Sequence, residues 1–462
     1  MRRPRVCLIV DNPLRDLDGL VLLAWQLAHR GVEAWLVPMY EQSFDVRAIG
    51  ADLVLVNYVR SNNIDHLMAY RREGIRVGVL DTEGVGGKTP DEFAALVASS
   101  GGAAAVDLYC VWGAAQREAL LKIGAVPEDR IQVTGCPRYD YCAPPWKNAL
   151  PLPDEPPGYV LINTNFPIIN PRFSSGAADE ADNAVKAGFS RQFAEAYVHD
   201  ARAAQAGLLS LMEKILEHWP NQRFILRPHP FEAHDCYQQL KRYTNFSLRQ
   251  EGTSVEWLNQ ARALLHLNCS TAVEAAMLGK PALSPGWLDT PVLHVPGPSS
   301  VSQIAASPKE LVENLNAVLG SSSASVDDRK PSQRLEALYH HIDGRAAERV
   351  ANAVLLALKT PFNSSIGPRP RLKSRVLNAS RKWLGYRTAT YITNARRPLV
   401  QLGLRASKLF TLNQVQSLVE RLDSCAQSNE AVRVSLMNHC AMPQRRLASQ
   451  QSIRLTNSTF GD

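Results

Sequence analysis

Side chains that could bind a phosphate gather in the stretch from Ala263 to Ser284. It begins as a short apolar run, continues as a polar turn and becomes a helical run that ends at a glycine and a proline. The pattern predicts a strand that delivers Ser270 and Thr271 to the N-terminus of a helix. Backbone N–H groups and the helix dipole would meet a phosphate there, although ordinary N-capping explains the same hydroxyls equally well. Glu274, one turn into the helix, could accept hydrogen bonds from ribose hydroxyls.

Two further polar clusters follow short apolar runs in the second half of the chain. One contains Asn163, Thr164 and Asn165, and the other contains Arg227 and His229. Arginine offers a planar, bidentate fork to phosphate oxygens, and an imidazole N–H can donate to the same group. Because the carboxyl ends of parallel strands share one edge of a sheet, we expect both clusters to join the Ser–Thr turn there. The prolines beside the histidine fix the backbone, but a histidine that merely caps a turn would show the same pattern.

Acidic residues take the corresponding position in the first half of the chain. Asp81 and Glu83 directly follow a predicted strand, where a carboxylate could act as a general base on a hydroxyl group or could simply cap the next turn. Strand alternation lets only one of the two face a ligand. Arg15, Asp16 and Asp18 follow the first predicted strand. They are candidates to contact an acceptor or a sugar acid, or they simply begin the first helix.

Alternating strands and helices position these residues. Short apolar runs predict strands at Arg5–Val10, Glu33–Pro38, Leu53–Val56, Val77–Leu80, Tyr109–Trp112, Ile131–Thr134, Tyr159–Ile162, Arg223–Leu226, Ala263–Leu267 and Pro281–Ser284. Helical patterns lie between and after them, at Asp16–Arg30, Asn63–Glu73, Ala115–Ile123, Ala194–His218 and Gln333–Leu358. The alternation predicts an α/β fold of parallel, doubly wound sheets, in which ligands bind beyond the carboxyl ends of the strands.

The length of 462 residues predicts more than one domain. A stretch rich in proline and acidic residues, Asn148–Pro157, is typical of a linker. We therefore expect one Rossmann-like domain at residues 1–150 and a second at residues 151–360. Residues 361–462 form a basic extension without the alternating pattern.

The net charge of +7 is concentrated in that extension. Residues 361–462 contain 16 basic and 4 acidic residues, a net charge of +12, whereas residues 1–360 contain 35 basic and 40 acidic residues, a net charge of −5. The main domains are therefore not expected to bind nucleic acid. Arg371–Trp383 and Arg396–Phe410 mix basic with apolar residues, which predicts helices that bind an anionic membrane surface. A disordered basic tail fits the composition equally well.

Cysteine usage and hydropathy indicate a cytoplasmic protein. The eight cysteines lack the close paired spacing of a zinc site, so we expect reduced and mostly buried thiols. The N-terminus has too short an apolar run for a signal peptide, and no run approaches the ~20 apolar residues that span a bilayer. The protein is expected to be cytoplasmic, either free or peripheral at the inner face of the membrane.

Most of residues 5–358 resembles the family of surface carbohydrate (surface polysaccharide) biosynthesis proteins. The likeness is carried, in order and spacing, by RDLDGLVLLAWQLAHRG, LDTEGVG, DLYCVWGAAQ, VTGCPRYD, YVLINTNF, RPHP and NCSTAVEAAMLGKPALS. The arrangement is also similar to glycosyltransferases of the GT-B fold, and among these to bacterial sialyltransferases, polysialyltransferases and capsule Kdo transferases. Glu83–Gly84, His229–Pro230 and Ser270–Thr271 take the places of the three motifs of that group.

Two details of the resemblance leave alternatives open. Thr82 stands where the acidic motif has the carboxylate usually credited as the base, which leaves Asp81 or Glu83 for that role. The helix that carries Glu274 is also similar to the donor-binding helix of UDP-sugar GT-B enzymes and of UDP-GlcNAc 2-epimerases. The base of the nucleotide therefore stays open.

The resemblance implies a glycosyltransferase with two Rossmann-like domains that face a cleft. The first domain would bind a saccharide or lipid-linked saccharide acceptor, and the second a nucleotide-sugar donor, with a CMP-linked ulosonic acid preferred. Arg227, His229, Ser270 and Thr271 would hold the donor phosphate, Glu274 the ribose, and Asn163 to Asn165 would line the cleft. No metal ion or other cofactor is expected, since a helix dipole and side chains can stabilise a leaving phosphate.

Three other functions remain compatible with the sequence. A UDP-GlcNAc 2-epimerase-like enzyme would use the same fold without an acceptor, and a CDP-polyol phosphotransferase would use a different donor. A non-enzymatic scaffold of a polysaccharide machine would use the basic extension for docking. The scaffold hypothesis does not explain why three phosphate-type strand ends occur in one domain.

Overall fold

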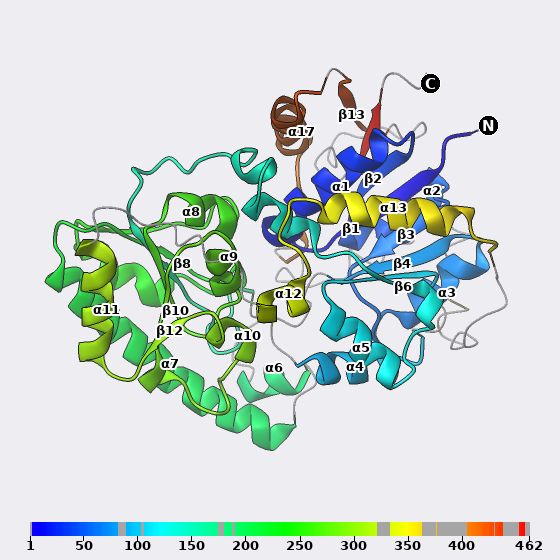
Figure 1. The fold of residues 1–462 in the computed structure, drawn as a ribbon. Coiled ribbons are helices and arrows are strands. Elements are labelled where there is room, and N and C mark those ends of the chain that lie inside the picture. Colours follow the sequence, from blue (N-terminus) through cyan, green and yellow to red (C-terminus); the bar gives the residue numbers. More distant parts are fainter. Residues whose placement is uncertain are drawn as a thin grey trace. The chain divides into compact units, whose positions relative to one another are not determined.

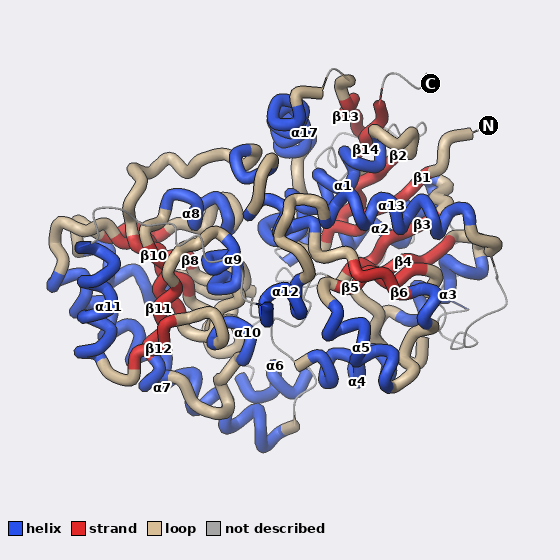
Figure 2. Tube along the Cα trace, in the orientation of Figure 1, coloured by secondary structure: helices blue, strands red, loops and turns tan. Residues whose placement is uncertain are grey.

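The computed structural model describes residues 2–81, 89–102, 106–173, 180–186, 190–320, 333–362, 376, 404–428, 430–437 and 452–457. The chain divides into two compact units, each with strands flanked by helices (Figures 1 and 2). Unit 1 consists of Met1–Val85, Thr89–Leu150 and Ser332–Asp462, and unit 2 consists of Gly86–Lys88 and Pro151–Pro331. Glu83, one of the two predicted bases, lies outside the described residues.

The sheet of unit 1 has eight strands in the order β13-β14-β2-β1-β3-β4-β5-β6. Their bounds are β1 (Arg5–Val10), β2 (Glu33–Pro38), β3 (Leu53–Val56), β4 (Arg76–Leu80), β5 (Leu108–Val111), β6 (Ile131–Val133), β13 (Val432–Leu436) and β14 (Ile453–Asn457). The six strands from β2 to β6 in this order pair in parallel, whereas β14 is antiparallel to both β2 and β13. Most residues of the parallel strands are buried, because helices cover both faces, and this explains their continuous apolar runs.

Helices follow each parallel strand of unit 1 except the last. These are α1 (Asp18–Ala28), α2 (Gln42–Ile49), α3 (Ile64–Arg72), α4 (Pro90–Ser99) and α5 (Ala114–Lys122), and the later part of the chain adds α12 (Gln333–Tyr339), α13 (Ala346–Lys359) and α17 (Leu412–Ala426). A π-helical turn at Pro13–Leu17, capped by the side chain of Asn12, leads from β1 into α1. The sequence pattern predicted one helix from Asp16, and the first turn of that helix is this π-helical segment.

Unit 2 contains a six-stranded sheet in the order β12-β11-β10-β7-β8-β9, with all pairs parallel. The strands are β7 (Val160–Asn163), β8 (Phe224–Arg227), β9 (Phe246–Leu248), β10 (Ala263–His266), β11 (Ala282–Pro285) and β12 (Gln303–Ala305). The helices are α6 (Glu180–Lys186), α7 (Arg191–His218), α8 (Ser254–Gln260), α9 (Thr271–Met277), α10 (Pro296–Ser299) and α11 (Pro308–Gly320). The apolar face of α7 packs with the strands in one core. The predicted parallel, doubly wound architecture is confirmed in both units.

The expected boundary at residue 360 is wrong, because α12 and α13 belong to unit 1 rather than to the second domain. Asp140 is the physical reason. This buried carboxylate lies far from α13 in sequence, yet its oxygens accept hydrogen bonds from the backbone N–H groups of Ala346 (2.9 Å) and Ala347 (2.8 Å). It thereby caps the N-terminus of α13 and attaches the helix to unit 1, beside α1 (Figure 1).

The described part of the basic extension is also built into unit 1. The extension was expected to be a helical or disordered tail, but it supplies α17 and the two strands β13 and β14 at one edge of the sheet. Trp25 of α1 donates a hydrogen bond of 2.7 Å from Nε1 to Asp423 of α17. The predicted membrane-binding helices, Arg371–Trp383 and Arg396–Phe410, lie outside the described residues except for Val376 and residues 404–410. None of the described helices has the length and apolar composition that spanning a bilayer requires.

Candidate functional site

The predicted polar clusters of unit 2 lie side by side at the carboxyl edge of its sheet. Asn163, the last residue of β7, is in register with Arg227 at the end of β8 and with His266 at the end of β10. The loops that carry the other predicted donor-binding residues leave the sheet at these three positions. The parallel topology therefore places these strand ends together, as the sequence pattern required.

The turn between β10 and α9 presents hydroxyl groups at the start of a helix. Ser270 is exposed and occupies the N-cap position of α9, and its side chain makes no capping hydrogen bond. Thr271 is buried, and its Oγ1 accepts a hydrogen bond of 3.0 Å from Nδ2 of Asn163. Asn268 turns the chain with a φ of 50°, and its carbonyl oxygen accepts a hydrogen bond of 3.3 Å from Nδ2 of Asn165. The hydroxyl of Ser270 is thus the part of this turn that faces outward.

Asn163 carries a buried side-chain oxygen at the carboxyl edge of the sheet. The residue is 6% exposed, and its Oδ1 has no hydrogen-bond partner among the described residues. Leaving a buried acceptor unpaired costs about 1–3 kcal/mol. Such an atom at the end of a strand, in the expected ligand position, indicates that a ligand group or an ordered water completes its hydrogen bonding.

His229 is held in one tautomer by its own loop. The backbone N–H of Phe231 donates a hydrogen bond of 3.2 Å to Nδ1 of His229. Because Nδ1 is the acceptor, the neutral imidazole carries its proton on Nε2. The ring is only partly buried and belongs to the loop that follows β8.

Glu232 joins the loop after β8 to the loop after β7. Its Oε2 accepts hydrogen bonds from Oγ1 of Thr164 (2.9 Å) and from the backbone N–H of Phe166 (3.2 Å), and its Oε1 accepts one from the hydroxyl of Tyr237. Burial raises the pKa of Glu232, and these hydrogen bonds oppose that shift. The sequence analysis did not find Glu232, because a carboxylate in a loop gives no signal until its partners are known. Thr164 was predicted to line the cleft, but its hydroxyl donates a hydrogen bond to the buried carboxylate of Glu232.

Arg227 makes contacts other than those expected of a phosphate ligand. It is 7% exposed, and its Nη2 donates to the carbonyl oxygens of Glu251 (3.1 Å) and Gly252 (2.6 Å). Its guanidinium lies over the ring of Trp257, 5.6 Å from the ring centre. Burial lowers the pKa of Arg227 to about 10. These contacts hold the loop that precedes α8.

Glu274 connects α9 to α8. Its buried carboxylate accepts a hydrogen bond from the hydroxyl of Ser254, the first residue of α8. His266, which the sequence analysis also missed, is 1% exposed, and burial lowers its pKa to about 4. Its Nδ1 accepts the N–H of Cys269 at 3.3 Å, and its Nε2 lies 2.8 Å from Oγ of Ser302. A neutral, buried histidine therefore holds the β10–α9 turn through the hydrogen bond from Cys269.

In unit 1, Asp81 follows β4 at the carboxyl edge of the sheet. It is 4% exposed, and its carbonyl oxygen accepts a hydrogen bond of 2.5 Å from Nε1 of Trp112. Burial raises the pKa of Tyr109 well above its usual range, and the nearby charge of Asp81 raises it further. The position is compatible with the predicted role as a base, which stays a prediction.

The other predicted residues of unit 1 lie in a chain of ion pairs after β1. Arg15 contacts Asp16 through Nε (2.7 Å) and Asp11 through Nη2 (3.2 Å). Asp11 also pairs with Nζ of Lys408, at 2.7 Å, and both of these side chains are largely buried. Lys408 comes from the extension, so local sequence could not show it. Asp18, the remaining predicted contact, begins α1, and its carbonyl oxygen accepts a hydrogen bond from the hydroxyl of Tyr141.

A second cation from the extension reaches the loop after β2. Arg405 is 8% exposed, and its Nη2 lies 2.7 Å from Oε1 of Glu41. The guanidinium also lies 4.8 Å from the centre of the ring of Tyr40. Residues 404–410 therefore cover part of the edge where unit 1 was expected to bind its ligand.

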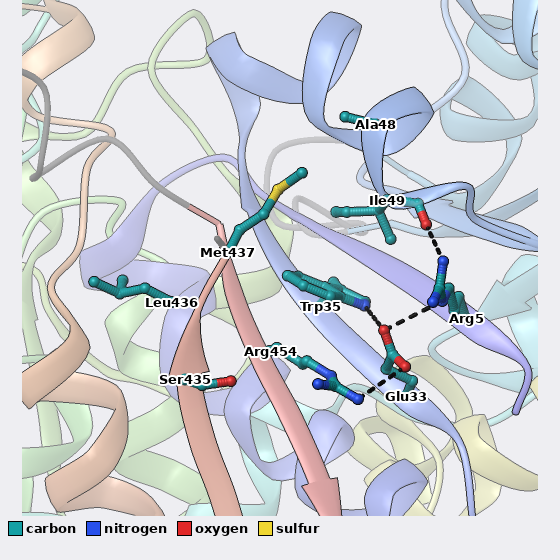
Figure 3. A pocket seen from close by; sticks show the side chains of 9 residues that line it. All are labelled: Arg5, Glu33, Trp35, Ala48, Ile49, Ser435, Leu436, Met437 and Arg454. Carbon is teal, nitrogen blue, oxygen red and sulfur yellow. Dashed lines mark hydrogen bonds and ion pairs between the residues drawn. The ribbon is translucent and has the colours of Figure 1, made fainter. Parts of the chain in front are cut away.

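The cavity shown in Figure 3 lies elsewhere in unit 1. It has a volume of about 320 Å³ and is lined by Arg5, Glu33, Trp35, Ala48, Ile49, Ser435, Leu436, Met437 and Arg454. Glu33 lies between Arg5 (3.3 Å) and Arg454 (3.1 Å). Arg5 and Glu33 are the first residues of β1 and β2, so this cavity lies at the amino ends of the parallel strands, opposite the candidate edge.

Comparison with known proteins finds structures with a similar fold. No family model and no curated protein matches this sequence. The structure of S. aureus MnaA with UDP is similar to this chain, with 13% sequence identity and a TM-score of 0.50 over 79% of this chain and 100% of MnaA. A Listeria monocytogenes protein described as a UDP-N-acetylglucosamine 2-epimerase has 14% identity and a TM-score of 0.50 over 78% of this chain and 99% of its own.

The wall teichoic acid polymerase TagF is also similar, with 13% identity and a TM-score of 0.44 over 77% of this chain and 88% of TagF. None of these three proteins is a sialyltransferase or a Kdo transferase. At these identities the likeness concerns the fold alone, and the fold is that of GT-B enzymes with two Rossmann-like domains.

Proposed function

We propose that this chain is a nucleotide-sugar enzyme and, more specifically, a glycosyltransferase of surface polysaccharide biosynthesis. The observation that carries the proposal is the carboxyl edge of unit 2, where Asn163, His229 and Ser270 come together on neighbouring strand ends. Uncharged donors beside a helix N-terminus suit the phosphate of a nucleotide-sugar. Oδ1 of Asn163, which has no hydrogen-bond partner in the described part of the chain, supports a ligand at this edge.

We assign a role to each residue of this edge on the basis of its contacts. Nε2–H of His229 and the hydroxyl of Ser270 would donate to the donor phosphate, while Thr271 holds Asn163 in place. Glu274 would accept hydrogen bonds from the ribose, in addition to the one from Ser254. Arg227 would support the site by holding the loop before α8, and its charge would also favour the phosphate at short range.

The proposed reaction transfers a sugar to an acceptor hydroxyl, with a CMP-linked ulosonic acid as the preferred donor. The acceptor oxygen forms a bond to the anomeric carbon, and the bond between that carbon and the phosphate oxygen breaks. The hydroxyl proton goes to a carboxylate of unit 1, Asp81 or Glu83, and the negative charge of the leaving phosphate is stabilised by His229 and Ser270. The acceptor would be a saccharide or a lipid-linked saccharide, presented at the inner face of the membrane.

A UDP-GlcNAc 2-epimerase-like activity is the second candidate. It is favoured by the fold shared with MnaA, whose structure contains UDP, and with the Listeria protein described as a UDP-N-acetylglucosamine 2-epimerase. An epimerase converts its nucleotide-sugar without an acceptor. Incubation of the protein with UDP-GlcNAc alone, followed by analysis of the sugar product, therefore separates the two activities.

A thermal-shift screen with CMP, UDP, CDP and GDP tests the proposal most directly. A ligand at a hundredfold its dissociation constant stabilises a fold by about 2.7 kcal/mol, which is easily measured. The full chain is the right sample, because α13 and the extension complete unit 1. A shift with CMP supports the ulosonic acid transferase, a shift with UDP favours a UDP-sugar enzyme, and no shift with any nucleotide contradicts the proposed function.

A further inference from the structure

We infer that Glu232 is a positioning residue that fixes the loops after β7 and β8 in the one arrangement that binds the phosphate of the ligand. The inference rests on the proposed function and goes beyond it, because Glu232 does not itself face the ligand. It is 0% exposed and contacts only groups of unit 2 among the described residues. Its role would be to hold other side chains in place.

Glu232 binds three donors from two parts of unit 2. Thr164 and Phe166 lie in the loop after β7, and Tyr237 lies in the short 3-10 helix Asp235–Arg242. A carboxylate can accept all three hydrogen bonds at once, two on one oxygen and one on the other. No neutral side chain of similar size has this capacity.

Backbone contacts join the same two loops around Glu232. The N–H of Ala233 donates to the carbonyl oxygen of Asn170, and the N–H of Arg172 donates to that of Phe231, both at 2.8 Å. Pro171 and Glu232 form an isolated antiparallel bridge between these contacts. The two loops therefore behave as one pair, and the carboxylate lies at its centre.

The pair of loops fixes the position and the tautomer of the His229 ring. The N–H of Glu232 donates to the carbonyl oxygen of His229 at 2.8 Å, which closes the turn. Within that turn the N–H of Phe231 reaches Nδ1 of the imidazole and leaves the proton on Nε2. A change at Glu232 that loosens the turn would therefore alter both the position and the tautomer of the histidine.

The energetics favour a positioning role over a purely stabilising one. Burial raises the pKa of Glu232, which means that the protein holds this charge at a cost in folding free energy. Hydrogen bonds from neutral donors offset part of that cost. A buried carboxylate is weak support for stability alone, and the fixed geometry of two ligand-binding loops is what it supplies.

The test compares nucleotide affinities of folded variants by isothermal titration calorimetry, with CMP and UDP as probes. In Glu232→Gln the amide nitrogen becomes a donor that faces either the Thr164 and Phe166 donors or the Tyr237 hydroxyl. We expect its nucleotide affinity to fall at least tenfold. Thr164→Val removes one of the three hydrogen bonds to the carboxylate and should lower the affinity about threefold, less than Glu232→Gln does, because the other two donors remain. Glu313→Gln, which breaks an exposed ion pair with Lys309 on α11, is the matched control and should bind as the wild type does.

A spectroscopic readout separates positioning from general stability. Nitrogen-15 NMR of the imidazoles, with the His229 signal assigned by its loss in His229→Gln, reports the tautomer of that ring. We expect the Nε2–H tautomer in the wild type and a mixture of tautomers in Glu232→Gln. Should Glu232→Gln fail to fold, Thr164→Val and Tyr237→Phe decide the question by the same two measurements.

The outcomes distinguish this inference from the proposed function. If the wild type binds neither CMP nor UDP nor the other nucleotides, the proposed function fails. If the wild type binds a nucleotide and the Glu232 and Thr164 variants bind it equally well with an unchanged His229 tautomer, the positioning role is overturned.

Discussion

The carboxyl edges of the two sheets hold their polar side chains in different ways. In unit 2, amides, hydroxyls and an imidazole are joined mainly by hydrogen bonds, and the hydroxyl of Ser270 faces outward. In unit 1, Asp11 and Glu41 are paired with the cations Lys408 and Arg405, which come from the distant extension. The edge of unit 2 thus presents neutral hydrogen-bonding groups, whereas two carboxylates at the edge of unit 1 are paired with cations of the same unit.

The difference follows from how each unit is assembled. Unit 2 is essentially one continuous segment, and its edge forms from its own strand ends. Unit 1 combines the first residues of the chain with α13, α17 and the strands β13 and β14. The edge of unit 1 should therefore depend on the extension for its stability, whereas the edge of unit 2 should depend on it for neither stability nor ligand binding.

The largest effect is expected when the buried ion pair of unit 1 is broken. Lys408→Met leaves the buried Asp11 with the longer contact to Arg15 as its one ion pair among the described residues, and breaking such a pair costs about 3 kcal/mol or more. Urea denaturation measures this loss as a lower free energy of unfolding. Nucleotide affinity, measured by calorimetry on the folded variant, should not change.

A control variant and a double variant make the Lys408 prediction specific. Lys309→Met removes a cation from an exposed pair in unit 2 and should change stability by no more than about 0.5 kcal/mol. The double variant Asp11→Asn with Lys408→Met should recover part of the loss, because no uncompensated charge remains. A single Lys408→Met variant as stable as the wild type would mean that the extension is not needed to neutralise this edge.

The dependence of unit 1 on α13 should appear as a pH effect. Burial raises the pKa of Asp140 to about 7, well above the ordinary aspartate value of 3.8. Between these two values the folded state binds a proton that the unfolded state has lost, so stability falls as the pH rises, by up to about 1.4 kcal/mol per pH unit. Asp140→Asn should lack this slope, and unfolding free energies of both proteins at pH 5, 6 and 7 measure the difference. Parallel pH profiles would contradict the assignment.

The sequence predicted several strands and the position of part of the candidate site correctly. Apolar runs located strands such as Arg5–Val10 and Glu33–Pro38 without error, because a strand buried on both faces must be apolar. The parallel topology then brought Asn163, Arg227 and the Ser–Thr turn to one edge, as expected. These predictions succeeded because they depend on local pattern and on one general rule of sheet geometry.

The residues that were missed depend on partners far away in the chain. Glu232 binds a threonine 68 positions earlier, Lys408 pairs with an aspartate 397 positions earlier, and Asp140 caps a helix 206 positions later. A loop carboxylate or a tail lysine has no local signature of such a contact. The strands β13 and β14 were missed for a related reason, since each is a short segment that becomes a strand only by pairing at the edge of an existing sheet.

At the edge of unit 2 the expected effects concern the ligand instead of the fold. His229→Ala removes the Nε2–H donor from a partly exposed loop, and a hydrogen bond to a charged group is worth about 1.5–3 kcal/mol. We expect nucleotide affinity to fall tenfold or more, with the unfolding free energy nearly unchanged. His218→Ala, at the end of α7, is the control and should leave affinity intact. Unchanged nucleotide binding by His229→Ala would show that His229 does not contact the nucleotide.

The smallest expected effect comes from substituting one of two serines that both occupy a helix N-cap position. The pair separates a role in stability from a role in ligand binding. Ser190 caps α7 by accepting the N–H of Phe193 at 3.2 Å, whereas Ser270 occupies the cap position of α9 without a capping hydrogen bond. Ser190→Ala should therefore cost about 1 kcal/mol of stability and no nucleotide affinity. Ser270→Ala should do the reverse, with stability retained and nucleotide affinity about threefold weaker, since water can replace the lost hydroxyl donor at this exposed position. Denaturation and calorimetry on both variants test this crossover; a Ser270→Ala variant that loses stability but binds nucleotide normally would make Ser270 an ordinary helix cap.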